Sequence, residues 1–284
     1  MTELFDEGLH SGISLGLEVG EIHYREKTEH QDLMIFDHAR FGRVMSLDGA
    51  VQTTENDEFI YHEMFAHVPV LAHGDVKKVL IIGGGDGGAA CQVLKHTGIE
   101  VTLVDIDRTV IDLSIKYMPT VSDGAFDNAR LNVIITDGCK FVKETTERWD
   151  VIIIDSTDPH GPGEVLYTQE FYSDCKSCLS DGGIIVTQNG IPFVQAEELR
   201  NSYDRLNTLF SDVSFYMATI PSYVGGALAF GWATNNTALR KLDTSLPAER
   251  YLDAEITTDY YSPEIHQASF VLPFYVQKIL TADK

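Results

Sequence analysis

The sequence is poor in cysteine and has no long apolar run. Its four cysteines are too few for a disulfide scaffold in a chain of 284 residues, and reduced thiols fit a cytosolic setting. Cys175 and Cys178 form one C-x-x-C without a second ligand pair nearby to complete a zinc site, so we interpret both as structural thiols on a helix. No stretch approaches the roughly 20 apolar residues of a membrane helix, and residues 1–7 contain no basic segment of a secretion signal. We therefore expect a cytoplasmic protein that does not enter a membrane.

Basic residues are also scarce. The chain has 21 Lys and Arg against 43 Asp and Glu, which gives a formal charge of −22. This charge repels nucleic acid and anionic lipid and favours small cations, although many proteins are acidic for solubility alone. The hydrophobic fraction of 44% is sufficient for a full core, and the length suggests one large domain or one domain with a small companion.

The N-terminal part, residues 1–54, has the pattern of a small antiparallel β domain. Short extended runs between Ser14 and Gln52 are separated by turn signals, notably Asp48-Gly49. The clearest runs are Glu21–Tyr24, Leu33–Asp37 and Arg43–Leu47. A helix is predicted next, from about Glu55 to His67, with Thr53 and Thr54 as possible caps and its end before Pro69.

From Lys78 onward, apolar runs of strand length alternate with segments of helical spacing, which predicts an α/β domain over residues 55–284 with a Rossmann-like, mostly parallel sheet flanked by helices. The expected strands are Val79–Ile82, Val101–Val104, Val133–Ile135, Val151–Ile154 and Ile184–Thr187. The expected helices are Gly88–His96, Thr109–Tyr117, Cys139–Thr145, Glu170–Leu179 and Ala196–Phe210. The link between the runs Val213–Ile220 and Ala227–Ala233 is too short for a crossover helix, so we expect an antiparallel pair at the sheet's end.

A glycine-rich turn, residues 83–88, follows the first of these strands and precedes a helix, which is the context of a nucleotide-binding loop. Asp105, at the end of the next strand, is placed to accept hydrogen bonds from ribose hydroxyls. Asp86 within the turn disfavours a pyrophosphate and favours a cation, so we interpret the ligand as a sulfonium nucleoside of the S-adenosylmethionine type. Asp137-Gly138 follows the third strand, where it could hold an adenine amino group or serve only as a turn and helix cap.

Two further carboxylates, Asp155 and Asp158, follow the strand Val151–Ile154 in a loop rich in proline and glycine. Ligands of open α/β sheets bind outside the carboxyl ends of the strands, so both carboxylates are predicted to face the site rather than form an ordinary solvated Asp-Pro turn. A primary amine has a pKa of roughly 10 and must lose a proton before it can attack an electrophile. Asp155 is the candidate proton acceptor.

Together, the glycine turn with Asp86, the stretch from Asp155 to Pro162, the triplet Tyr61-His62-Glu63 and residues 51–54 resemble the polyamine aminopropyltransferases, the family of the spermidine synthases. The resemblance extends from about Tyr24 to the end and implies a methyltransferase-type sheet, homodimers or homotetramers, and transfer of an aminopropyl group from decarboxylated S-adenosylmethionine to putrescine, without a cofactor or metal. It implies these donor-binding residues: Gln31, Asp86, Asp105, Asp137, Gly138 and Pro162. It implies these polyamine-binding residues: Tyr61, His62, Asp86, Asp155, Asp158, Gln188 and Tyr223. Asp155 would be the catalytic proton acceptor, and residues 156–166 would form a lid.

Several alternatives remain at this point. Many family members have Glu at the position of Asp105, and the shorter side chain could weaken nucleoside binding. His62 and His67 are five residues apart, which is wrong for the two zinc ligands of a metalloprotease helix, so His67 is interpreted as structural. An S-adenosylmethionine methyltransferase and a non-catalytic polyamine or nucleoside sensor are the rival functions. Cadaverine, agmatine or spermidine could replace putrescine, and no acidic residue is identified at the far end of the amine channel.

Overall fold

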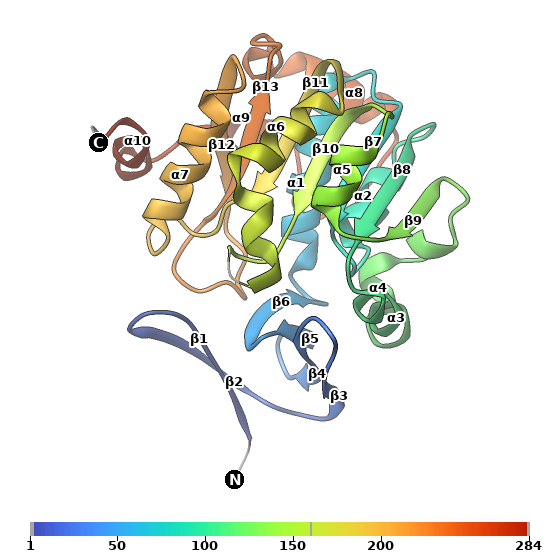
Figure 1. Ribbon diagram of the computed structural model, residues 1–284, viewed down its shortest axis with the longest axis vertical. Coiled ribbons are helices and arrows are strands. Elements are labelled where there is room, and N and C mark those ends of the chain that lie inside the picture. Colours follow the sequence, from blue (N-terminus) through green and yellow to red (C-terminus); the bar gives the residue numbers. More distant parts are fainter. Residues whose placement is uncertain (1–2, 160, 283–284) are drawn as a thin grey trace.

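The computed structural model describes residues 3–159 and 161–282, and for residues 161 and 162 it describes the backbone only. The strands of these residues form three sheets: a two-stranded hairpin, a four-stranded antiparallel sheet and a seven-stranded mixed sheet. Figure 1 shows the two N-terminal sheets in blue on one side of the seven-stranded sheet. No helix in the described part of the chain is both long and apolar enough to span a membrane.

The N-terminal sheets confirm the predicted antiparallel β structure. The hairpin consists of β1 (Leu4–His10) and β2 (Ile13–Glu18). The four-stranded sheet consists of β3 (Ile22–Lys27), β4 (Asp32–His38), β5 (Gly42–Leu47) and β6 (Ala50–Thr54). The Asp48-Gly49 turn has φ values of 50° and 79°, the positive values of a two-residue hairpin turn. The β1 strand was not predicted, because its seven residues include three charged or glycine positions that weaken the strand pattern.

The seven-stranded sheet has the order β12-β13-β11-β10-β7-β8-β9. Its strands are β7 (Lys78–Gly83), β8 (Glu100–Asp105), β9 (Leu131–Ile135), β10 (Trp149–Asp155), β11 (Leu179–Gln188), β12 (Asp212–Ala218) and β13 (Leu228–Thr234). The pairs from β11 through β9 are parallel, whereas β13 is antiparallel to both β11 and β12. The predicted parallel sheet with a terminal antiparallel pair is confirmed.

Helices cover both faces of this sheet (Figure 1). They are α1 (Glu58–His73), α2 (Gly88–Leu94), α3 (Arg108–Tyr117), α4 (Pro119–Ser122), α5 (Gly138–Glu144), α6 (Gln169–Ser177), α7 (Ala196–Asn207), α8 (Ser245–Asp253), α9 (Pro263–Ser269) and α10 (Phe274–Thr281), with short 3-10 turns η1 (Ala125–Asp127), η2 (Gly161–Tyr167) and η3 (Leu239–Lys241). Alternate residues of β7 belong to different cores: Val79 and Ile81 pack with α1 and α2, while Leu80 and Ile82 pack with α5 and α6. The two cores hold the carboxyl ends of the central strands in fixed positions.

The predicted end of the first long helix is wrong. Helix α1 (Glu58–His73) continues through Pro69 and ends at Gly74, which has a φ of 83°. A proline inside a helix removes a hydrogen bond and costs about 3 kcal/mol. Because α1 is buried between the sheet and the C-terminal helices, with residues 60–72 all buried, packing offsets that cost. The predicted caps are also wrong: Thr54 instead donates its hydroxyl to Asp57 at 2.7 Å.

Candidate active site

A cavity of about 790 Å³ lies at the carboxyl ends of β7, β8 and β10, and strands of both N-terminal sheets form its opposite wall. Its position agrees with the rule that open α/β sheets bind ligands at these ends. The following predicted site residues line it: Gln31, Tyr61, His62, Asp86, Asp105, Asp137, Gly138, Asp155, Asp158, Gln188 and Tyr223. Pro162 is the exception, because its side chain lies outside the described part of the chain.

At one end of the cavity, Asp105 is a partly buried acid. Its Oδ1 accepts the N–H of Asp107 at 2.8 Å, and burial raises the pKa of Asp105 to about 6. A Cβ atom at Gly85 would lie 2.8 Å from Asp105 Oδ2, so glycine lets the loop pass close to this carboxylate. Gln31 reaches the same region from the four-stranded sheet, where its Nε2 donates to Asp107 at 3.3 Å. These residues form a polar end of the cavity in which a carboxylate oxygen can accept further hydrogen bonds.

For Asp137, the sequence left open a role as a helix cap or as a residue of the binding site. It is the N-cap of α5, and its Oδ1 accepts the N–H groups of Cys139 at 2.7 Å and Lys140 at 3.3 Å. It also lines the cavity together with Gly138. The capping role is therefore present in the structure, and a role in adenine binding stays a prediction.

The glycine turn brings β7 and β10 into contact at the centre of the cavity. Gly83 and Gly84 have φ values of 84° and 70°, which favour glycine. A Cβ atom at Gly83 would overlap the carbonyl oxygen of Asp155, and the N–H of Gly84 donates to that oxygen at 3.1 Å. The turn therefore fixes the position of Asp155 as well as the floor of the cavity.

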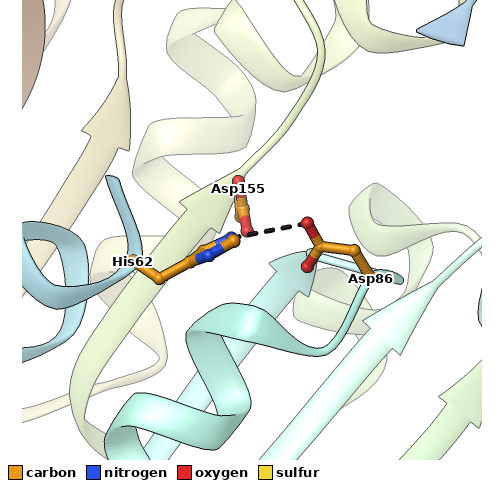
Figure 2. A group of neighbouring side chains, drawn as sticks. All are labelled: His62, Asp86 and Asp155. Atoms are coloured by element: carbon orange, nitrogen blue, oxygen red, sulfur yellow. Dashed lines mark ion pairs between the residues drawn. The ribbon is translucent and has the colours of Figure 1, made fainter. Parts of the chain in front are cut away.

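The centre of the cavity holds Asp155, Asp86 and His62, which converge from three different elements (Figure 2). Burial, with the nearby Asp86 carboxylate, raises the pKa of Asp155 to about 7, against the lowering effects of the His62 charge and of the Tyr61 hydroxyl, which donates to Asp155 Oδ1 at 2.6 Å. Despite burial, the His62 charge and the Gly88 N–H lower the pKa of Asp86. Asp155 is thus a buried carboxylate poised to take up a proton near neutral pH.

His62, Asp86 and Asp155 present ligand atoms within 4.8 Å of one another, so their fit to a metal ion is worth testing. Both nitrogens of His62 face carboxylates, Glu58 at 2.5 Å and Asp86 at 3.4 Å. Although burial opposes it, the two carboxylates raise the pKa of His62 well above its usual value. An imidazole that is protonated on both nitrogens is a hydrogen-bond donor and not a metal ligand. The arrangement therefore suits an organic cation better than a metal ion.

Beyond Asp155, the cavity continues along Asp158, Gln188 and Tyr223. Gln188 Nε2 donates to Asp158 at 3.1 Å, while Gln188 Oε1 accepts the hydroxyl of Tyr167 at 2.7 Å. Tyr223 packs edge to face with Tyr61, with 6.3 Å between the ring centroids, and its hydroxyl donates a hydrogen bond to the Gln52 carbonyl. The walls of this part of the cavity are aromatic, and its polar groups are held in place by hydrogen bonds.

Glu7 is a cavity residue that the sequence reasoning missed. It lies on β1, is only 8% exposed and accepts the Val51 N–H at 3.1 Å. Burial raises its pKa to about 7, and the nearby Asp158 carboxylate contributes to the increase. A signal exists in the sequence: Glu7 lies between Phe5 and Leu9 at a spacing of two, so it occupies the inward face of an alternating strand.

Charge distinguishes this cavity from the rest of the molecule. Of the described residues that line it, eight are acidic and none is Lys or Arg. The acids are Asp6, Glu7, Asp48, Asp86, Asp105, Asp137, Asp155 and Asp158. Such a site attracts cations and disfavours a carboxylate or phosphate ligand.

Comparison with known proteins gives the family. The spermine/spermidine synthase domain matches residues 58–243, and the spermidine synthase tetramerisation domain matches residues 3–55. The chain belongs to the spermine/spermidine synthase family. The chain is 54% identical to the polyamine aminopropyltransferase of Ruegeria sp. (strain TM1040), with 96% of each chain covered. It is 51% identical to polyamine aminopropyltransferase 1 of Pseudomonas aeruginosa, also with 96% of each chain covered.

Solved structures of this family have the same fold. A spermidine synthase crystallised with the transition state analogue AdoDATO is 35% identical, with a TM-score of 0.93 and coverage of 98% of this chain and 94% of that one. The spermidine synthase of Thermotoga maritima is 33% identical, with a TM-score of 0.90 and the same coverage. The resemblance and the methyltransferase-type fold inferred from the sequence are confirmed, and the chain is an aminopropyltransferase.

Proposed function

We propose that the protein transfers the aminopropyl group of decarboxylated S-adenosylmethionine to putrescine, giving spermidine and 5′-methylthioadenosine. The observation that carries this proposal is the cavity lining, which combines eight acidic residues with no Lys or Arg among the described residues. Both substrates are cations, and they suit this lining. Intact S-adenosylmethionine, the donor of a methyltransferase, has a carboxylate for which the described lining offers no Lys or Arg, and His62 already faces the carboxylates of Glu58 and Asp86.

The donor would bind at the end of the cavity that contains Gln31, Asp105, Asp137 and Gly138, with Pro162 in the adjoining loop. Asp105 would accept hydrogen bonds from the ribose hydroxyls through its Oδ2, because Oδ1 is already bonded to the Asp107 N–H. Asp86 would hold the donor's amino group. The sulfonium then lies near the centre of the cavity, and residues 156–166 would close over the bound substrates.

Putrescine would occupy the channel lined by Tyr61, His62, Asp158, Gln188 and Tyr223. Its reacting amine lies beside Asp155, and the distal ammonium would lie near Glu7. Glu7 supplies the acidic residue at the far end of the channel that the sequence did not identify.

In the reaction, Asp155 would accept a proton from the reacting amine. The freed nitrogen lone pair then attacks the aminopropyl carbon bonded to sulfur, a C–N bond forms, and the C–S bond breaks with its electron pair returning to sulfur. The sulfonium becomes a neutral thioether, and no oxidant or cofactor is consumed. Alignment of the reactants can supply several kcal/mol, and a positioned base adds roughly 10²- to 10⁴-fold.

The match to a tetramerisation domain over residues 3–55 supports assembly into a homo-oligomer. We propose a homodimer or homotetramer in the cytoplasm, without a nucleic acid or membrane partner. Light scattering coupled to size-exclusion chromatography distinguishes the two assemblies.

The deciding experiment incubates the purified protein with decarboxylated S-adenosylmethionine and equimolar putrescine, cadaverine, agmatine and spermidine, followed by mass spectrometry. Intact S-adenosylmethionine serves as a parallel donor. Spermidine and methylthioadenosine formed from the decarboxylated donor alone are the expected products. A methylated product from the intact donor identifies a methyltransferase, and tight nucleoside binding without turnover identifies a sensor; either result overturns the proposal.

A further inference from the structure

Glu58 lies outside the cavity but contacts one of its central residues. It precedes His62 by one turn of α1, and its Oε2 lies 2.5 Å from His62 Nδ1. On the other side of the ring, His62 Nε2 lies 3.4 Å from Asp86 Oδ2. The first distance is short enough for a direct hydrogen bond between the ring and the carboxylate, and the second is beyond the usual range. Glu58 is therefore the closer ion-pair partner of His62, while Asp86 contributes more to its raised pKa, so the two carboxylates share the imidazolium.

The imidazole ring of His62 is packed tightly, so it cannot turn to other hydrogen-bond partners. His62 is 2% exposed, and a Cβ atom at Gly88 would overlap its ring, so the first residue of α2 packs directly on it. The titratable groups that face the ring are Glu58 and Tyr61 from α1, Asp86 from the glycine turn, Asp155 from β10 and Cys91 from α2. All but the tyrosine and the thiol are carboxylates.

A buried imidazolium needs a counter-ion, because an uncompensated charge in the interior is costly. Without Glu58, the partners left to His62 would be Asp86 and Asp155, which face the substrates. Each of these carboxylates would then neutralise the histidine instead of a ligand ammonium.

We propose that Glu58 is a positioning residue that serves as the dedicated counter-ion of the His62 imidazolium and thereby leaves Asp86 available to the amino group of the donor. The proposal rests on the proposed function, because it assigns the donor's ammonium to Asp86. Glu58 itself does not touch substrate; it acts through His62.

The test uses Glu58→Gln, which keeps the size of the side chain and removes its charge. Titration of His62 followed by nitrogen-15 NMR, with His62→Gln to assign the signal, should show that the imidazolium loses its proton at lower pH in E58Q than in the wild type. Glu58→Asp, which retains the charge, should restore part of the difference. Asp112→Asn is the matched control, because it removes the charge of an exposed i,i+4 pair with Arg108 on α3.

Calorimetry then compares two nucleosides that differ in the amino group. E58Q should bind decarboxylated S-adenosylmethionine roughly tenfold more weakly, the size expected for one charge-assisted contact. It should bind methylthioadenosine, which lacks the ammonium, as the wild type does. Binding that weakens equally for both nucleosides, or a titration of His62 that is unchanged in E58Q, overturns the proposal. Neither measurement depends on turnover, so a failure of the proposed reaction is seen separately in the mass-spectrometric assay.

Discussion

The pKa values of two buried histidines on α1 are shifted in opposite directions. His62 faces Glu58 and Asp86, and these carboxylates raise its pKa well above the usual value although burial opposes them. His67 is five residues later, about 140° around the helix, and contacts His96 at 2.9 Å and Gln92 at 3.2 Å. Burial lowers the pKa of His67 well below the usual value, and His96 lowers it further. Burial alone therefore does not decide the charge of a histidine; the partners do.

The same contrast extends to the regions around the two residues. In the cavity, burial raises the pKa values of Asp155 and Glu7 to about 7, so the folded state binds protons that the unfolded state releases. This contribution to stability is present at low pH and is lost as the pH rises through 7. In the histidine cluster, burial lowers the pKa of His96 to about 4, so stability is lost as the pH falls from 6.5 toward 4. On acidification, the cavity therefore contributes more to the stability of the fold, while the histidine cluster contributes less.

The largest expected effect tests whether the cavity carries the chemistry. Asp155→Asn should lower kcat by roughly 10²- to 10⁴-fold, because the amine loses its proton acceptor. Binding of methylthioadenosine, measured by calorimetry, should change little. Asp150→Asn is the matched control: it lies on the same strand, but its carboxylate accepts the N–H groups of Lys77 and Lys78 at 2.8 and 3.0 Å. A kcat of D155N close to that of D150N would show that Asp155 is not the base.

The second prediction tests the contribution of the histidine cluster to the pH dependence of the free energy of unfolding. Relative to the wild type, His96→Gln should gain about 3 kcal/mol in the free energy of unfolding between pH 7 and pH 4, because the variant no longer has a histidine that the unfolded state protonates first. Urea unfolding at a series of pH values measures this difference. His30→Gln, outside the cluster, is the control. A difference between H96Q and the wild type that does not vary with pH would refute the buried neutral histidine.

The third prediction concerns the end of the cavity that β1 supplies. Glu7→Gln should raise the KM for putrescine roughly tenfold, since one charged contact to the distal ammonium is lost. The KM of the donor and the kcat at saturation should stay near the wild-type values. Glu18→Gln, an exposed acid on the paired strand β2, is the control in steady-state assays. An equal increase in both KM values would place Glu7 outside the amine channel.

The smallest expected effect tests how a hydrogen-bond partner, Tyr61, shifts the pKa of Asp155. In the wild type, kcat/KM should rise with pH through about 7, because Asp155 must be ionised to accept a proton. Tyr61→Phe removes a hydroxyl whose hydrogen bond lowers the pKa of Asp155, so the rising limb should move to higher pH with only a modest change in the plateau. A pH–rate profile of Y61F that superimposes on that of the wild type would contradict this role.

Most of the α/β domain could be predicted from the sequence because its strands are uninterrupted apolar runs, as in Val151–Ile154. Local sequence signals gave wrong or no helix assignments where packing against the rest of the chain determines the secondary structure. Pro69 ends a helix in isolation but not in α1, which is buried on all sides. Helices α8 to α10 were not predicted, and α8 and α10 have only one buried residue each, Pro247 and Val276.

The site could be predicted where acids follow strands, since β7, β8 and β10 bring Asp86, Asp105 and Asp155 to one edge of the sheet. Glu7 and Glu58 could not be assigned in this way. Glu7 is in a hairpin whose docking against the cavity depends on long-range packing, and Glu58 precedes the triplet that carries the resemblance. Glu7 is visible only once β1 has been placed next to Asp158, whereas the i,i+4 spacing of Glu58 and His62 on one helix is a sequence signal for their contact.

The hairpin of β1 and β2 supplies one wall of the cavity, whereas Asp155 lies at the end of β10 and Asp86 in the turn after β7. Substitutions in the hairpin can therefore change the length and polarity of the amine channel without disturbing the residues that perform the chemistry. In the proposed reaction, acceptor choice and catalysis would be carried by separable parts of one chain. On the same proposal, substitutions in the first two strands would change which amine is accepted while the reaction itself stays the same.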